Sequence, residues 1–126
     1  MLADPMRVEL PGRSASIADA RSAAREFARE CGASPDVLAL AASEAVTNAI
    51  VHGYRNGDHG SIELVGYRDG DQCVLEVADR GVGMLPHPGS KGLGMGLPVI
   101  GNLAEQVEIL DAGPGTLIRM RFGLAG

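Results

Sequence analysis

The chain has 126 residues, of which 45% are hydrophobic and 3% aromatic, and its formal net charge is -5 at pH 7. This length is typical of one domain, so residues 1–126 are expected to fold as a single domain around one core. A negative charge with few aromatic side chains argues against nucleic-acid binding, which needs a cationic surface. No apolar run reaches the roughly 20 residues that span a bilayer, so we expect a cytoplasmic protein without a membrane segment.

The chain is expected to begin with a short strand around Arg7–Leu10, followed by a helix. Ser16 with Asp19 forms a capping pattern that marks the helix start, and Gly32 marks its end. Apolar residues recur between these signals at the helical period: Ile17, Ala20, Ala24, Phe27, Ala28 and Cys31. This pattern is typical of a helix that only packs against a core.

A second helix is expected to start after Ser34, with a proline at its first position, and to run to His52. One broad side of this helix is apolar and consists of Leu38, Ala39, Ala41, Ala42, Ala45, Val46 and Ala49. A separate polar stripe consists of Asp36, Ser43 and Thr47. Glu44 and Asn48 lie one turn apart and fall on neither side. A carboxylate and an amide therefore emerge from an otherwise apolar flank.

The rest of the chain predicts four strands and one short helix. The strands are 61–67 and 73–78, which form a hairpin, and 106–110 and 116–122; the helix is 97–104. The expected fold class is an α/β two-layer sandwich, with a mixed, mainly antiparallel sheet of about five strands and three helices on one face. The other face of the sheet is expected to remain solvated.

The two cysteines and three histidines form no recognisable motif. Cys31 and Cys73 are far apart in the sequence, make no CxxC pair and lie in apolar segments. This arrangement predicts reduced thiols in the core rather than a disulfide. His52, His59 and His87 lack the spacing of a metal site.

A glycine-rich loop, residues 81–96, is the strongest chemical signal. Gly92, Gly94 and Gly96 stand directly before the short helix, where glycines let backbone N–H groups converge on an anion. Lys91 precedes these glycines and no GKS or GKT follows, so this is not a Walker loop, and the spacing does not match a dinucleotide fingerprint. A lone GxGxG is more often a surface turn, so the loop needs support from other residues.

Four short segments, taken together, resemble the N, G1, G2 and closing boxes of the GHKL ATPases. They are Glu44 with Asn48, Asp79-x-Gly81-x-Gly83, Gly92-Leu93-Gly94-Met95-Gly96-Leu97, and Gly115-Thr116. Within that superfamily, residues 43–54 look most like the bacterial anti-sigma factor serine/threonine-protein kinases of sporulation and general stress. The resemblance covers nearly the whole chain, and it implies the GHKL (Bergerat) fold with ATP and Mg²⁺ as cofactors.

The resemblance implies a role for each matched residue. Asn48 matches the asparagine whose amide oxygen binds Mg²⁺, and Asp79 matches the carboxylate that reads adenine. Thr116 matches the threonine beside that aspartate, and Glu44 matches the proposed general base. The other ATP-binding positions are Gly81, Gly83, Met84, Lys91, Gly92, Leu93, Gly94, Met95, Gly96 and Leu97. The residues alone leave alternatives open: a turn-capping Asp79, a Glu44 paired with a cation, and a solvent-facing Lys91.

One segment departs from the family that the sequence resembles. Only Met84–Lys91 separates Gly83 from Gly92, whereas those kinases usually carry a longer ATP lid there. Two prolines, Pro86 and Pro88, also exclude a helix from this stretch. The short lid weakens the prediction of phosphoryl transfer more than it weakens the prediction of ATP binding.

Two functions follow from the resemblance. The first is an anti-sigma factor and protein kinase that binds a sigma factor and phosphorylates a serine or threonine of an antagonist protein. The alternative is a nucleotide-gated binding module without kinase activity. A histidine-kinase catalytic domain and a topoisomerase ATPase fit less well, because the sequence offers neither a phospho-acceptor helix pair nor a transducer domain. Dimerisation is typical of the kinases that the sequence resembles.

Overall fold

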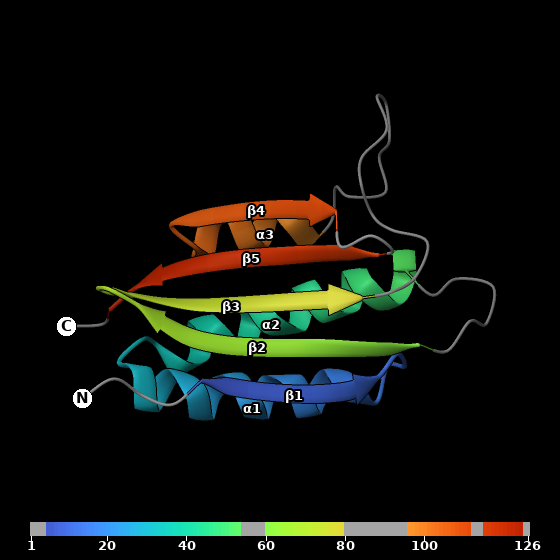
Figure 1. The fold of residues 1–126 in the computed structure, drawn as a ribbon, viewed down its shortest axis with the longest axis horizontal. Helices are drawn as coiled ribbons and strands as arrows, with labels where there is room; N and C mark the ends of the chain where they lie inside the picture. The colour runs from blue at the N-terminus through green and yellow to red at the C-terminus, as the bar shows by residue number, and fades with distance from the viewer. Residues whose placement is uncertain (1–4, 54–59, 80–95, 112–114, 125–126) are drawn as a thin grey trace.

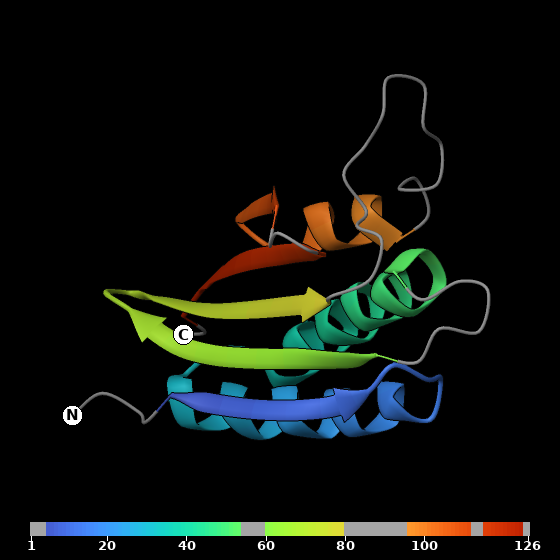
Figure 2. The same cartoon turned by 45° about the vertical axis from the view of Figure 1, so that its right-hand side comes forward.

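The computed structural model describes residues 5–53, 60–79, 96–111 and 115–124. They form two layers, a sheet with helices packed on one of its faces (Figure 1). Figure 2, turned by 45°, shows the helical layer on one side of the sheet. No helix in these ranges is long and apolar enough to cross a membrane.

The sheet has five strands. They are β1 (Met6–Pro11), β2 (Ser61–Asp69), β3 (Gln72–Asp79), β4 (Gln106–Asp111) and β5 (Thr116–Gly123). Their order across the sheet is β1-β2-β3-β5-β4, and each neighbouring pair is antiparallel. The expected sheet is therefore present, and its described pairings are antiparallel throughout rather than mixed. The strands β3 and β5 are neighbours inside the sheet, and both contribute residues to the candidate site.

The helical layer contains three helices and one π-helical turn among the described residues. They are α1 (Ser16–Cys31), α2 (Pro35–Asn48), η1 (Ala49–Gly53) and α3 (Gly96–Leu103). The core between the layers is built from large apolar side chains, including Phe27, Leu38, Ile62, Leu64, Leu75, Ile100, Ile118 and Met120. The side of α2 that was expected to be apolar is buried in this core, as the periodicity predicted.

The start of α1 differs from the sequence prediction. Ala15 occupies the N-cap position and makes no side-chain cap bond, so the capping role assigned to Ser16 and Asp19 is wrong. The Ser16 hydroxyl donates instead to the Pro11 carbonyl at 2.6 Å, which ties the helix start to the end of β1. The end of α1 is as expected, because Gly32 has a φ of 99°, in the left-handed region where glycine terminates helices.

The second helix starts as predicted and ends earlier. The Ser34 hydroxyl accepts from the backbone N–H of Val37 at 3.5 Å, and a proline follows at the first helical position. The α-helix was expected to reach His52, but α-helical winding stops at Asn48 and residues 49–53 form a π-helical turn. Such turns often mark functional sites, and this one follows a candidate site residue directly.

The two cysteines are placed correctly in the core but are not reduced thiols. Cys31 at the end of α1 and Cys73 near the start of β3 form a disulfide with an S–S distance of 2.16 Å. Their 42-residue separation hides this proximity, because it arises only when α1 packs on the sheet. The expectation of two free thiols is therefore wrong.

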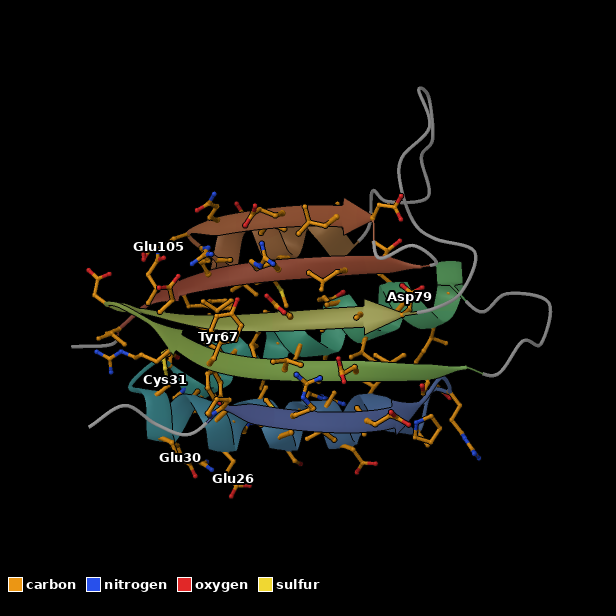
Figure 3. The ribbon with its side chains drawn as sticks, in the orientation of Figure 1. Glu26, Glu30, Cys31, Tyr67, Asp79 and Glu105 are labelled. Carbon is orange, nitrogen blue, oxygen red and sulfur yellow. A yellow bond between two sulfur atoms is a disulfide. The ribbon has the colours of Figure 1, made fainter. Side chains whose placement is uncertain are left out.

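The sheet face away from the helices carries an ion-pair network. Glu76 accepts from the Tyr67 hydroxyl and from Arg119 Nε, both at 2.7 Å, and Arg121 pairs with Asp69 at 2.8 Å. Figure 3 shows Tyr67 lying across this face. Charged side chains at this density agree with the expected solvated face.

Candidate functional site

Buried polar residues locate the candidate site. Among the described residues, four polar or charged residues are buried: Ser16, Asn48, Asp79 and Thr116. Burying such groups is costly unless they are hydrogen-bonded, so each needs an explanation. The hydrogen bond from Ser16 to β1 explains the first. The other three are all positions that the sequence singled out.

Asp79 and Thr116 lie at the same end of neighbouring strands. Asp79 is the last residue of β3 and is 1% exposed, and Thr116 is the first residue of β5 and is fully buried. Ala78 pairs with Leu117 across these antiparallel strands, so Asp79 and Thr116 each lie one residue beyond that pair. The strand register therefore places a carboxylate and a hydroxyl side by side at one edge of the core.

The register also brings a further polar residue to this edge. Asp111 at the end of β4 is paired with Thr116, and on the other side Ile62 is paired with Asp79. Sequence reasoning did not single out Asp111. Only the pairing of β4 with β5 places it here, so no local pattern could have revealed it.

Asn48 approaches the same edge from the helical layer. It is the last residue of α2 and is 6% exposed, and the turn η1 that follows it contacts β3. Figure 3 shows Asp79 at the end of β3 that lies toward the end of α2. Three elements, α2, β3 and β5, thus contribute one buried polar side chain each.

The amide of Asn48 is incompletely satisfied. Its Nδ2 atom is buried and has no hydrogen-bond partner among the described residues. An unmet buried donor costs about 1–3 kcal/mol, so native proteins rarely retain one without a reason. A polar ligand that reaches the end of α2 would accept this hydrogen bond.

Glu44 lies one turn before Asn48 on α2 and is half-buried. It forms no ion pair with any residue in the described ranges. The alternative of a glutamate held by a neighbouring cation therefore has no support from those residues. A carboxylate in this position is available to a reacting group beside the Asn48 amide.

The loop positions are only partly described. Gly96 and Leu97 begin α3, which packs beside α2, so the helix expected after the glycine-rich loop is present. The remaining predicted positions lie outside the described residues: Gly81, Gly83, Met84, Lys91, Gly92, Leu93, Gly94 and Met95. The segment that contains them leaves directly after Asp79 and ends at the start of α3.

No group of three or more His, Cys, Asp or Glu side chains that could hold a metal ion occurs in the ranges that the structure covers. This does not conflict with the Mg²⁺ that the resemblance implies. Mg²⁺ commonly takes one or two protein oxygens and completes its shell with waters and substrate phosphates. An asparagine oxygen is a ligand of that kind.

Comparison with known proteins identifies the family of the chain. Residues 10–122 match the family described as the histidine kinase-like ATPase domain. The chain therefore belongs to this family. Two curated relatives point to a narrower group within it. The anti-sigma F factor of Clostridium beijerinckii is 28% identical, with 94% of this chain and 95% of the relative covered. That of Thermoanaerobacter sp. is 31% identical, with 91% and 90% covered.

A solved structure with a similar fold also matches the chain. The crystal structure of the RsbU and RsbW domains of Rv1364c from Mycobacterium tuberculosis superposes with a TM-score of 0.75 at 25% identity. The match covers 97% of this chain but 33% of the Mycobacterium chain, so the protein spans about a third of that larger one. The chain is thus an ATPase domain of the histidine kinase-like type whose relatives are anti-sigma factors.

Proposed function

We propose that the protein is an ATP-dependent anti-sigma factor that binds a sigma factor and phosphorylates a serine or threonine of an antagonist protein. One observation carries this proposal: the unsatisfied Asn48 amide lies one turn after Glu44, at the edge where Asp79 and Thr116 are buried. A nucleotide with its metal would complete such a site. The names of the curated relatives support the choice of partner.

Asp79 and Thr116 hold the base in this proposal. The carboxylate accepts a hydrogen bond from the exocyclic amine of adenine, and a charge-assisted bond of this kind is worth about 1.5–3 kcal/mol. The Thr116 hydroxyl lies beside that carboxylate and orients it. Guanine carries a carbonyl where adenine carries the amine, so the same pocket disfavours it.

Asn48 and the loop hold the phosphates. Mg²⁺ supplies charge neutralisation at the phosphate oxygens when it is bound, with the Asn48 side-chain oxygen as a protein ligand. By the resemblance, the phosphates would be bound by backbone N–H groups of Gly81, Gly83 and residues 92–97, and the nucleotide would also be contacted by Met84 and Lys91.

Glu44 acts as the general base. The acceptor hydroxyl attacks the γ-phosphorus while the bond from that phosphorus to the β,γ-bridging oxygen breaks and ADP leaves. The hydroxyl proton passes to the Glu44 carboxylate as the new bond forms. Leu40, one turn before Glu44, and Val51 in η1 are 42% and 53% exposed, which suits the docking of a protein substrate beside the base.

We also infer a cytoplasmic site of action and a homodimer, both from the group to which the relatives belong. The alternative function remains a nucleotide-gated binding module, in which ATP controls a partner surface without transfer. The short lid, Met84–Lys91, favours this alternative.

Labelled ATP separates the two functions. The protein, Mg²⁺, γ-³²P-ATP and the antagonist protein encoded nearest to it are incubated together, and label on the antagonist is measured. We expect label with the parent protein and almost none with Asp79→Ala, which cannot hold adenine. ATP-dependent binding of a sigma factor without any label on the antagonist would establish the gated module instead.

A further inference from the structure

The disulfide lies at the start of two elements that end at the candidate site. Cys31 is the last residue of α1, and α2 begins shortly after it at Pro35. Cys73 is the second residue of β3. From there α2 and β3 run in the same direction and end at Asn48 and Asp79 (Figure 1). Figure 3 shows Cys31 and Asp79 toward opposite ends of the sheet.

This arrangement couples the disulfide to the geometry of the site. The bond fixes the corner between α1 and α2 to β3, with the Cα atoms of the two cysteines 6.2 Å apart. Both α2 and the turn η1 that follows it contact β3. A covalent tie at the start of the two elements therefore restricts how far Asn48 and Asp79 can move apart at their ends.

A cation holds the same corner. Arg68 on β2 is paired with Cys73, and its side chain donates to the Cys31 carbonyl at 3.2 Å and to the Gly70 carbonyl at 2.8 Å. The guanidinium thus ties the end of α1 to the turn between β2 and β3. It also keeps a positive charge beside the cysteine pair. A neighbouring cation favours the thiolate, which is the form of cysteine that exchanges with disulfides.

The fold is compatible with both redox states of the pair. Cys31 and Cys73 are 1% and 0% exposed and belong to the apolar core. A reduced cysteine packs as a small apolar side chain, so the core and the hydrogen bonds of Arg68 remain when the bond is broken. Because burial shields the sulfur atoms, exchange takes place when the end of α1, capped by Gly32, opens locally.

We propose that the Cys31–Cys73 pair is a redox switch that sets the affinity of the nucleotide site. With the bond formed, α2 and β3 hold Asn48 and Asp79 at the spacing that one nucleotide needs. With the bond broken, the two ends separate more freely and ATP binds more weakly. The inference rests on the proposed nucleotide site and the proposed cytoplasmic location. In a reducing compartment a disulfide is usually transient and redox-sensing rather than a permanent support.

A small-molecule disulfide is the oxidant. The Cys31 thiolate attacks one sulfur of that disulfide and expels a thiolate, which leaves a mixed disulfide on Cys31. The Cys73 thiolate then attacks the Cys31 sulfur, so the cross-link forms and a second thiolate leaves. The two released thiolates take up the two protons that the cysteines lose. Two electrons pass from the cysteine pair to the small disulfide, and an excess of the small thiol reverses both steps.

The first measurement compares the two redox states of the parent protein. The full chain is titrated with Mg-ATP in a calorimeter, once after oxidation with oxidised glutathione and once after reduction with dithiothreitol. Alkylation followed by mass spectrometry counts the free thiols, and circular dichroism establishes that both samples are folded. We expect the oxidised protein to bind ATP about five- to tenfold more tightly, at the lower end of typical coupling between two sites.

The second measurement uses the reciprocity of coupling. The protein is equilibrated in glutathione buffers of increasing oxidised fraction, with and without Mg-ATP, and the cross-linked fraction is measured. If the disulfide raises the ATP affinity, ATP must raise the equilibrium constant for forming the disulfide by the same factor. A redox equilibrium that ATP does not move would overturn the proposal. A cross-link that remains complete in millimolar reduced glutathione would also overturn it.

Cys31→Ala with Cys73→Ala is the control variant. It cannot form the bond, so it should bind ATP as the reduced parent does, and dithiothreitol should not change its affinity. An equal response of parent and variant to dithiothreitol would overturn the proposal, because the reductant would then act elsewhere. Equal ATP affinity in the oxidised and reduced parent would overturn the switch and leave the nucleotide site standing. Absence of ATP binding in both states would overturn the proposed function, and the switch with it.

Discussion

The ring of Phe27 lies directly on the backbone of Gly66. A Cβ built on Gly66 would be 2.9 Å from two ring atoms, closer than Cβ atoms approach other groups in proteins. Phe27 is 2% exposed and joins α1 to the middle of β2. Glycine at this position is therefore a packing requirement, because any larger residue would push the Phe27 ring away from β2.

Gly66→Ala should destabilise the fold by about 1–3 kcal/mol, because the added methyl forces Phe27 away from the sheet. Urea unfolding followed by circular dichroism measures this free energy. Gly101→Ala is the matched control, since a Cβ there meets nothing within 4 Å and alanine favours helix by about 1 kcal/mol. The two variants should shift stability in opposite directions. A Gly66→Ala protein as stable as the parent would show that the ring moves without cost.

The disulfide between Cys31 and Cys73 should contribute strongly to stability. It closes a loop with a sequence separation of 42, for which the chain-entropy relation gives about 4 kcal/mol. Unfolding of Cys31→Ala with Cys73→Ala should therefore occur at a lower urea concentration. Air-oxidised parent protein should show no reactive thiol after denaturation, and both should appear once dithiothreitol is added to the denatured chain. Two reactive thiols in the denatured but unreduced protein would contradict the cross-link.

Tyr67 should make the fold sensitive to alkaline pH. Burial, and then its hydrogen bond to Glu76, raise the pKa of Tyr67 above the ordinary value of 10.0. Well below pH 10 the Tyr67 hydroxyl is protonated in both the folded and the unfolded state, so it makes the free energy of unfolding neither rise nor fall with pH. As pH rises above 10 the unfolded chain loses the proton first, and stability falls. Urea midpoints of the parent and Tyr67→Phe between pH 8 and 11.5 test this expectation, and parallel curves would refute it.

Local signals in the sequence located most of the elements. Ser34, before a proline, caps the start of α2, and Gly32 ends α1 in a left-handed conformation. Both signals involve only neighbouring residues, so these helix ends can be predicted without knowing the tertiary structure. Asn48 was recognisable for a related reason. Its amide interrupts an apolar flank, and the structure buries that position.

Other features depend on contacts between distant segments. Ser16 forms its hydrogen bond to Pro11 instead of capping α1, because β1 lies within reach of the helix start. The disulfide and the place of Asp111 beside Thr116 follow from layer packing and strand register. No sequence window contains both partners of these contacts at a diagnostic spacing, so they could not be predicted.

Asn48→Ala should weaken ATP binding mainly when Mg²⁺ is present. Only the metal-bridged part of the binding energy is lost, so the affinity in EDTA should change much less. Calorimetric titration of parent and variant under both conditions gives the comparison, and Ser43→Ala on the same helix serves as the control. Equal losses with and without the metal would identify Asn48 as a structural residue whose amide only supports the end of α2.

Glu44→Gln tests the chemistry itself. The amide keeps the shape of the side chain but cannot accept a proton, so the variant should bind Mg-ATP and its protein partners nearly as the parent does. Its rate of phosphate transfer should fall by about 10²–10⁴-fold, the usual effect of removing a general base. Single-turnover transfer to the antagonist measures the rate, and nucleotide titration verifies that binding is intact.

Because Glu44 forms no ion pair among the described residues, the substitution should not disturb folding through a lost partner. Transfer at the parental rate would exclude Glu44 as the base. Loss of nucleotide affinity in parallel with the rate would instead show that Glu44 acts in ground-state binding, together with Asn48.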